Sequence, residues 1–362
     1  MAMDLAPSVR LLLLASGLAL LPLGWLWLRQ RDAGVRAQLL ALVALTGFLT
    51  FDLIVFGSFT RLSDSGLGCP DWPGCYGHAS PIGAATDIHA AQTALPSGPV
   101  TFSKAWVEMI HRYLAMTVGA LIVVQVALGW GWRKALPVSP WRATLALVWV
   151  VVQGLFGMLT VTMKLNPAIV TLHLLGGMLL LALLVWQYEG LRARPLRWPA
   201  WARRMLWGTS AVLVLQIALG AWVSSNYAVL ACSGFPQCNG AWWPDMDFGH
   251  GFTLVRDLGR SGAGDYLPFE ALVAIHMTHR LFAIVAGIAL LWLAHGLWHH
   301  LGQRRAALAL LGLTLLQVAT GLSNVVLGWP LAAALVHSAG AALLVGVLAS
   351  LLSRTAPARR AS

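Results

Sequence analysis

Nine long apolar segments divide the chain, and short polar or basic connections separate most of them. The segments lie near 11–28, 37–59, 106–132, 141–163, 168–188, 205–226, 270–298, 306–327 and 331–352. A helix needs about 20 mostly apolar residues to cross a bilayer, so each segment predicts a transmembrane helix. The pattern therefore predicts an all-α polytopic membrane protein.

The first segment has two interpretations. A charged start followed by an apolar run is typical of a signal peptide, but no small-residue cleavage site follows it. The next stretch, 29–36, carries three arginines. We therefore interpret 11–28 as an extra anchoring helix that precedes eight core helices.

Composition and charge agree with a membrane protein. Hydrophobic residues make up 58% of the chain and charged residues 10%, too few to cover a water-soluble globule. The net charge of +11 does not indicate a nucleic-acid partner, because the basic residues cluster between apolar runs. The connections on one side hold 16 of the 24 basic residues, in 29–36, 133–142, 189–204, 299–305 and 353–362. The positive-inside rule predicts that this side, with the C-terminus, is the cytoplasmic face of the inner membrane.

The other side has two long loops, near 58–105 and 227–269. They contain all four cysteines, namely Cys69, Cys75, Cys232 and Cys238. Disulfides persist outside the cytoplasm, and the short spacing favours a bond within each pair. Such a bond is either a structural staple or a redox-active pair of thiols.

The second half of the chain repeats the first. A glycine lies twelve residues before the first cysteine of each loop, and a glutamine lies twenty residues before a later histidine; these pairs are Gly57 and Cys69, Gly220 and Cys232, Gln153 and His173, Gln317 and His337. Four helices per copy give both copies the same orientation, a parallel repeat. The predicted organisation is an extra helix and link (1–36), a four-helix bundle (37–190), a basic linker (191–204), a second four-helix bundle (205–352) and a tail (353–362).

The repeat places four intramembrane histidines at similar depth, about 9 to 14 Å inside the outer boundary at roughly 1.5 Å per residue; they are His111, His173, His279 and His337. One such histidine alone is readily explained as a helix–helix contact, but duplicated ionisable groups inside a membrane indicate function. Imidazoles from two helices of a bundle are a ligand set for haem iron. Zinc or copper is disfavoured because each pair lacks further ligands, apart from Glu108. His295, His299 and His300, at a helix end, are predicted to be solvated.

Charged neighbours distinguish the two copies. Glu108 precedes His111 by three residues, whereas His276 precedes His279. A carboxylate beside one site can accept protons, although an acidic residue near a helix start is also favoured by the helix dipole. Arg112 and Arg280 are each candidates to bind a haem propionate or to reach the outer interface, and Arg61 has the same two interpretations.

Several of these motifs resemble the haem A synthase family. They are Phe56–Leu67, the Cys-Pro-Asp-Trp-Pro run from Cys69, Glu108–Arg112 and His279–Arg280, and the resemblance extends from about 37 to 352. It implies oxidation of the C8 methyl group of haem O to the formyl group of haem A in two steps, through an alcohol and a hydrate. The partners it implies are haem O synthase and cytochrome oxidase or its assembly factors, and a homo-oligomer is a further candidate.

The resemblance also assigns the sites. It implies that the substrate haem binds in the first half at His111 and His173, with Glu108 as the acid or base. It implies that a permanent haem b (iron) binds in the second half at His279 and His337. The extra first helix departs from the family pattern.

Three alternatives follow from the residues alone. A b-type electron-transfer cytochrome needs the histidines but not Glu108 or such long loops. A loop-cysteine oxidoreductase that passes electrons to quinone needs the cysteines but not the histidines. A transporter can use parallel repeats, yet no helix shows a broken, charged midplane site.

Overall fold

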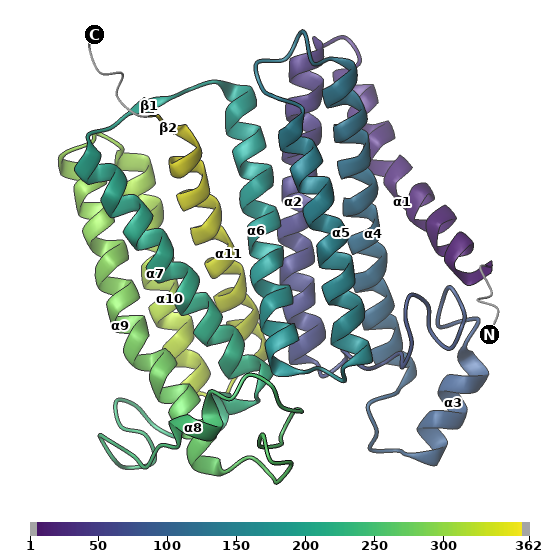
Figure 1. Cartoon of the computed structure of the whole chain (residues 1–362), viewed down its shortest axis with the longest axis vertical. Helices are drawn as coiled ribbons and strands as arrows, with labels where there is room; N and C mark the ends of the chain where they lie inside the picture. Colours follow the sequence, from purple (N-terminus) through teal and green to yellow (C-terminus); the bar gives the residue numbers. More distant parts are fainter. Residues whose placement is uncertain (1–5, 357–362) are drawn as a thin grey trace. The chain divides into compact units, whose positions relative to one another are not determined.

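The computed structural model describes residues 6–356, and they form an all-α protein. Nine helices in this part of the chain are long and apolar enough to cross a membrane. They are α1 (Ala6–Gln30), α2 (Val35–Leu62), α4 (Phe102–Gly131), α5 (Trp141–Thr162), α6 (Pro167–Arg192), α7 (Ala200–Ser225), α9 (Phe269–His299), α10 (Arg304–Val326) and α11 (Leu331–Arg354). All nine predicted segments, including the extra first helix, are therefore confirmed as long apolar helices (Figure 1).

Apolar side chains on the outside of the helices explain why this fold belongs in lipid. On α9, for example, Ile288 is 61% exposed and Trp292 is 68% exposed. Large exposed apolar surfaces are rare on soluble monomers. The protein is accordingly a multi-pass membrane protein.

The remaining elements are short and lie in the connections. They are α3 (Ala85–Ala94), the 3₁₀ helix η1 (Ala228–Leu230), α8 (Phe248–Gly251), β1 (Leu196–Arg197) and β2 (Thr355–Ala356). The two strands pair in parallel, with Leu196 opposite Thr355. These elements belong to segments that were expected only as loops, linker and tail.

The chain divides into two compact units. The first consists of the residues up to Leu165 together with Leu179–Ala193, and the second of Asn166–Met178 together with the residues from Arg194 onward. Helix α6 thus contributes its first half to the second unit and its second half to the first. The last division falls within the expected linker, 191–204.

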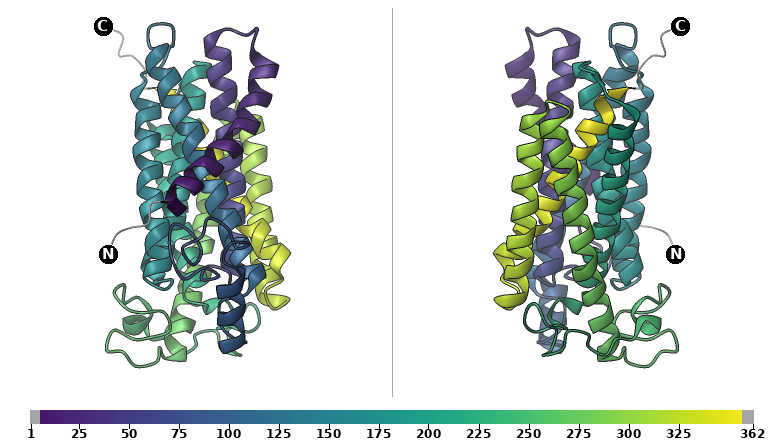
Figure 2. Two further views of the ribbon diagram at one scale, coloured as in Figure 1. Left: turned by 90° about the vertical axis from the view of Figure 1, so that its right-hand side faces the viewer. Right: turned by 90° about the vertical axis from the view of Figure 1, so that its left-hand side faces the viewer.

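The first unit is built around α4. This helix packs against α1, α2 and α5, and Figure 2 shows α1 running obliquely across its neighbours. Leu39 and Leu42 of α2 meet Leu121 of α4 and Ala19 of α1 in one buried cluster. Next to it, Gln125 donates a hydrogen bond to the buried Thr46 hydroxyl over 2.7 Å, so a polar contact also joins α2 and α4.

The second unit is a closed ring of four helices. Helix α9 packs against α7 and α10, and α11 packs against the same two helices, so α9 and α11 occupy opposite corners. Leu206, Leu293, Leu310 and Leu348, one from each helix, belong to the same buried cluster. This is the four-helix bundle that can present side chains from facing helices toward its interior.

Candidate haem-binding site

In the second unit, two of the four intramembrane histidines lie on opposite helices of the ring. His279 is on α9 and His337 on α11. Each imidazole packs against a glycine of a neighbouring helix: a Cβ atom at Gly220 would lie 2.9 Å from Cε1 of His279, and one at Gly321 would lie 3.4 Å from Cε1 of His337. Glycine at position 220 therefore lets the ring approach the helix backbone closely.

Polar side chains hold both rings of the second unit. The Nδ1 atom of His337 lies 2.9 Å from the Thr320 hydroxyl, and Nδ1 of His279 lies 3.1 Å from the side-chain amide of Gln216. A third contact, from the Gln317 amide to the backbone oxygen of His337, is 2.8 Å long. When Nδ1 carries the ring proton, Nε2 of each ring is the nitrogen available to a metal.

These residues fit a haem iron with two imidazole ligands. The ligands come from opposite corners of one bundle, and their outer nitrogens have polar partners, as is usual for metal-bound histidine. The described part of the chain contains no cluster of three or more His, Cys, Asp or Glu residues arranged to hold a metal ion. A zinc site built from three or four protein ligands therefore has no counterpart among these residues.

The first unit repeats the contact between glycine and histidine. His111 is on α4, and a Cβ atom at Gly57 of α2 would lie 2.9 Å from its Cε1 atom, the same value as for Gly220 and His279. Phe56 adds a nearly parallel ring, with centroids 6.4 Å apart and planes 8° apart. The repeat detected in the sequence is thus reproduced at the level of side-chain packing.

His173, on α6, lies in the segment that belongs to the second unit. Its Nδ1 atom is buried and has no hydrogen-bond partner among the described residues. The pairing of His111 with His173 stays a prediction.

Glu108 and Arg112 lie one helical turn apart on α4 and form a buried ion pair. Only 4% of Glu108 is exposed. One carboxylate oxygen, Oε2, accepts a hydrogen bond from the backbone N–H of Cys69 over 2.8 Å, and the other contacts Arg112. Both oxygens of Glu108 are therefore engaged within the protein.

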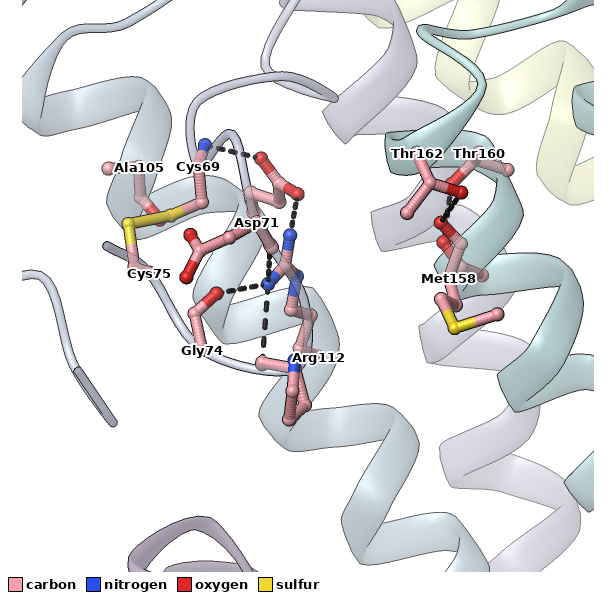
Figure 3. A network of polar contacts seen from close by, with 12 residues as sticks. Cys69, Asp71, Gly74, Cys75, Ala105, Arg112, Met158, Thr160 and Thr162 are labelled. Carbon is pink, nitrogen blue, oxygen red and sulfur yellow. Dashed lines mark hydrogen bonds and ion pairs between the residues drawn. A yellow bond between two sulfur atoms is a disulfide. The ribbon is translucent and has the colours of Figure 1, made fainter. Parts of the chain in front are cut away.

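Arg112 also holds the first cysteine loop. Its Nη1 atom donates to the backbone oxygens of Asp71, over 2.9 Å, and of Gly74 (Figure 3). The Asp71 carboxylate in turn accepts hydrogen bonds from the backbone N–H groups of Tyr76 and Gly77, at 2.6 and 2.7 Å. Arg112, expected to reach a propionate or the outer interface, is thus directed to the loop.

The second unit contains the matching arrangement with a neutral group in place of the carboxylate. Arg280 donates from Nε to Nε2 of His276 over 3.0 Å, and Nδ1 of His276 donates to the backbone oxygen of Ala228 over 2.9 Å. Arg280 further donates to the backbone oxygens of Cys232 and Gly234, at 3.3 and 3.1 Å. An arginine anchors the cysteine loop in both units.

Each cysteine loop is closed by its own disulfide. The bonds join Cys69 with Cys75 and Cys232 with Cys238, the pairing within loops that the spacing favours. All four cysteines are almost completely buried, which fits a structural staple within each loop.

Sequence reasoning missed Gln216 and Thr320, and it used Gly57 and Gly220 only as markers of the repeat. The repeat itself held the signal, because its register places apolar residues at the first-half positions that match Gln216 and Thr320. His295 and His299 lie at the exposed end of α9 with ring centroids 4.5 Å apart, in accord with the expected solvated position. Arg61 lies in the last turn of α2.

Comparison with known proteins places the chain among relatives of similar length. A family model described as cytochrome oxidase assembly protein matches residues 18–349. A haem A synthase of Shewanella oneidensis is 40% identical over 328 residues, which cover 87% of this chain and 96% of the relative. A haem A synthase of Sphingopyxis alaskensis is 30% identical over 349 residues, or 89% of this chain and 92% of the relative. The chain belongs to the cytochrome oxidase assembly protein family, within its group of haem A synthases.

Proposed function

We propose that this protein is a haem A synthase, an oxidoreductase that converts the C8 methyl group of haem O to the formyl group of haem A. The observation that carries the proposal is the 40% identity to a relative named haem A synthase, which covers 87% of this chain and 96% of the relative. The duplicated histidine sites on α4, α6, α9 and α11 supply the ligands that a haem substrate and a haem cofactor need.

The two halves of the sequence have different roles in this proposal. The first-half histidines, His111 and His173, hold the substrate haem, and His279 and His337 hold a haem b that stays bound. The bound iron supplies the oxidation chemistry. The protein's own residues orient the macrocycle through the imidazoles and exclude water by the apolar packing of the bundles.

Glu108 is the proposed proton acceptor of the first half. Oxidation of a methyl group releases protons as well as electrons, and in a low-dielectric site those protons need a positioned base. Glu108 precedes His111 by one turn, and Arg112 and the Cys69 N–H fix its carboxylate in one orientation. To accept a proton, the carboxylate gives up one of these two contacts, and Arg112 keeps its bonds to the loop carbonyls.

The charge pattern and the family membership support proposals for the membrane, the orientation and the partners of the protein. We propose the cell inner membrane, with the cysteine loops and the histidine layer toward the outer side and the C-terminus in the cytoplasm. The excess of basic residues in the opposite connections supports this orientation. Haem O synthase, cytochrome oxidase and its assembly factors are the proposed partners, together with a second copy of the chain.

The experiment that tests the function is haem extraction and chromatography from cells that make haem O. Cells expressing the protein are expected to accumulate haem A, and cells with an empty vector only haem O. Haem O that stays unconverted, with a purified protein that carries haem b alone, would contradict the proposal and favour a b-type electron-transfer cytochrome.

A further inference from the structure

We infer that Gln216 and Thr320 are positioning residues that fix the two second-half imidazoles for a permanently bound haem. The first half has Leu53 and Phe156 at the matching positions, which suits a haem that enters and leaves. The inference rests on the proposed function, because it assumes haem on these histidines.

The Thr320 hydroxyl determines which nitrogen of His337 carries the proton. Its Oγ1 atom lies 2.7 Å from the backbone oxygen of Leu316, which can only accept, so the hydroxyl hydrogen is directed there. Oγ1 of Thr320 also lies 2.9 Å from Nδ1 of His337. Because its hydrogen is already directed to Leu316, Oγ1 must accept at this contact. His337 is therefore protonated on Nδ1, and the lone pair of Nε2 remains for iron.

Gln216 can act in the same way on His279. Its amide contacts Nδ1 over 3.1 Å and the backbone oxygen of His279 over 3.3 Å, while its Oε1 atom is buried without a hydrogen-bond partner in the described structure. Rotating the amide by half a turn brings Oε1 to Nδ1, which then donates. This rotation gives up the longer contact and leaves Nε2 of His279 with a lone pair for iron.

The first half lacks both side chains. The register that aligns Gly57 with Gly220 places Leu53 opposite Gln216, and the register that aligns His173 with His337 places Phe156 opposite Thr320. Neither leucine nor phenylalanine can accept a hydrogen bond. In agreement, Nδ1 of His173 is buried without a partner among the described residues.

This difference has a direct consequence for haem retention. A hydrogen bond from Nδ1–H makes the imidazole a stronger electron donor and holds the ring in its binding orientation, and loss of such an outer partner typically weakens metal binding about 10- to 100-fold. A cofactor that stays in place benefits from both effects. A substrate that must leave as product does not.

The test replaces the hydroxyl of Thr320 and follows the haem rather than turnover. Purified Thr320→Val is expected to transfer haem b to excess apomyoglobin about 10- to 100-fold faster than the parent protein, and its haem b midpoint potential should rise because the imidazole donates less charge to the ferric iron. Thr320→Ser keeps the hydroxyl and should restore both values. Gln216→Leu should act in the same direction as Thr320→Val.

The matched control is Thr314→Val, because Thr314 lies on the same helix, is buried, and donates to the backbone oxygen of Leu310 over 2.7 Å. Its haem transfer should equal that of the parent. Equal transfer and equal potential in Thr320→Val and the parent would overturn the inference. A haem b that persists in His337→Ala would instead refute the proposed ligand, and with it the assigned site, so the two failures are distinguishable.

Discussion

The two units of this protein share a framework and differ in the chemistry placed on it. In both, a glycine of one helix lies against the imidazole of the next, at the same 2.9 Å for Gly57 with His111 and Gly220 with His279. In both, an arginine one residue after that histidine binds the carbonyls of a disulfide loop. Both units therefore present a histidine packed closely against a neighbouring helix, beside a loop that an arginine anchors.

The differences lie at three positions next to the histidines. The first unit pairs its loop arginine with the carboxylate of Glu108, and the second pairs it with the neutral imidazole of His276. The second unit also has polar partners for His279 and His337, where the sequence of the first has Leu53 and Phe156. A carboxylate near the first-half histidine suits a half in which a reaction takes place. Imidazoles with polar partners suit a half that retains a cofactor.

The largest expected effect is on turnover, when the carboxylate of the first unit is removed. Glu108→Ala should lower conversion of haem O by about 10²- to 10⁴-fold, the usual contribution of a positioned acid or base, with second-half haem b retained. Glu108→Gln keeps an acceptor for the Cys69 N–H but cannot take a proton, so it should be as inactive. The measurement is haem extraction at matched protein levels.

The control for this comparison is Glu270→Ala, because Glu270 is an exposed residue in the first turn of α9. It should convert haem O like the parent. Activity near the parental level in Glu108→Gln, but not in Glu108→Ala, would show that Glu108 serves only to hold the cysteine loop.

The second prediction compares the two loop arginines. Arg112→Ala leaves the buried carboxylate of Glu108 without its partner, and breaking a buried ion pair from one side typically costs about 3 to 5 kcal/mol. Both variants lose the hydrogen bonds to the loop carbonyls, but Arg280→Ala leaves only a neutral imidazole behind, and burying an unpaired neutral group costs less than burying an unpaired charge. Thermal unfolding in one detergent should therefore show a clearly larger fall in Tm for Arg112→Ala. An equal decrease in Tm for the two variants would mean that the charge of Glu108 does not affect the stability of the folded state.

The smallest expected effect concerns the disulfides. Each closes a ring of few residues, for which chain-entropy arguments give about 2 kcal/mol, and the arginine contacts persist without the bond. Cys69→Ser and Cys232→Ser should thus lower Tm modestly and to a similar extent. Mass mapping of the unreduced parent protein should find both bonds within loops. A loss of all haem A production in Cys69→Ser with an unchanged Tm would instead point to thiols that act in turnover.

Much of the fold could be predicted from the sequence because hydropathy reports each membrane helix separately. The predicted segment 141–163, for example, differs from α5 by one residue at its end. The short helices α3 and α8 were not predicted, because they lie in mixed polar loops where local pattern is weak. Their positions depend on the packing of each loop against its bundle.

The site could be predicted only in part, for a related reason. The repeat identified the histidines, since identical spacing is visible in the sequence. The direction of Arg112 was not visible, because its acceptors are backbone carbonyls whose positions depend on the folded loop. The role of Thr320 depends on a contact with His337, seventeen residues away on another helix, and single-residue properties give no sign of it.

The most direct test of the division between the two halves is the haem content of paired histidine variants. His111→Ala and His337→Ala are purified from cells that make haem O, and their haems are extracted and separated by chromatography. The account predicts that His111→Ala retains haem b and lacks haem O and haem A, whereas His337→Ala loses haem b. Loss of haem b from His111→Ala, with haem b retained in His337→Ala, would contradict the account.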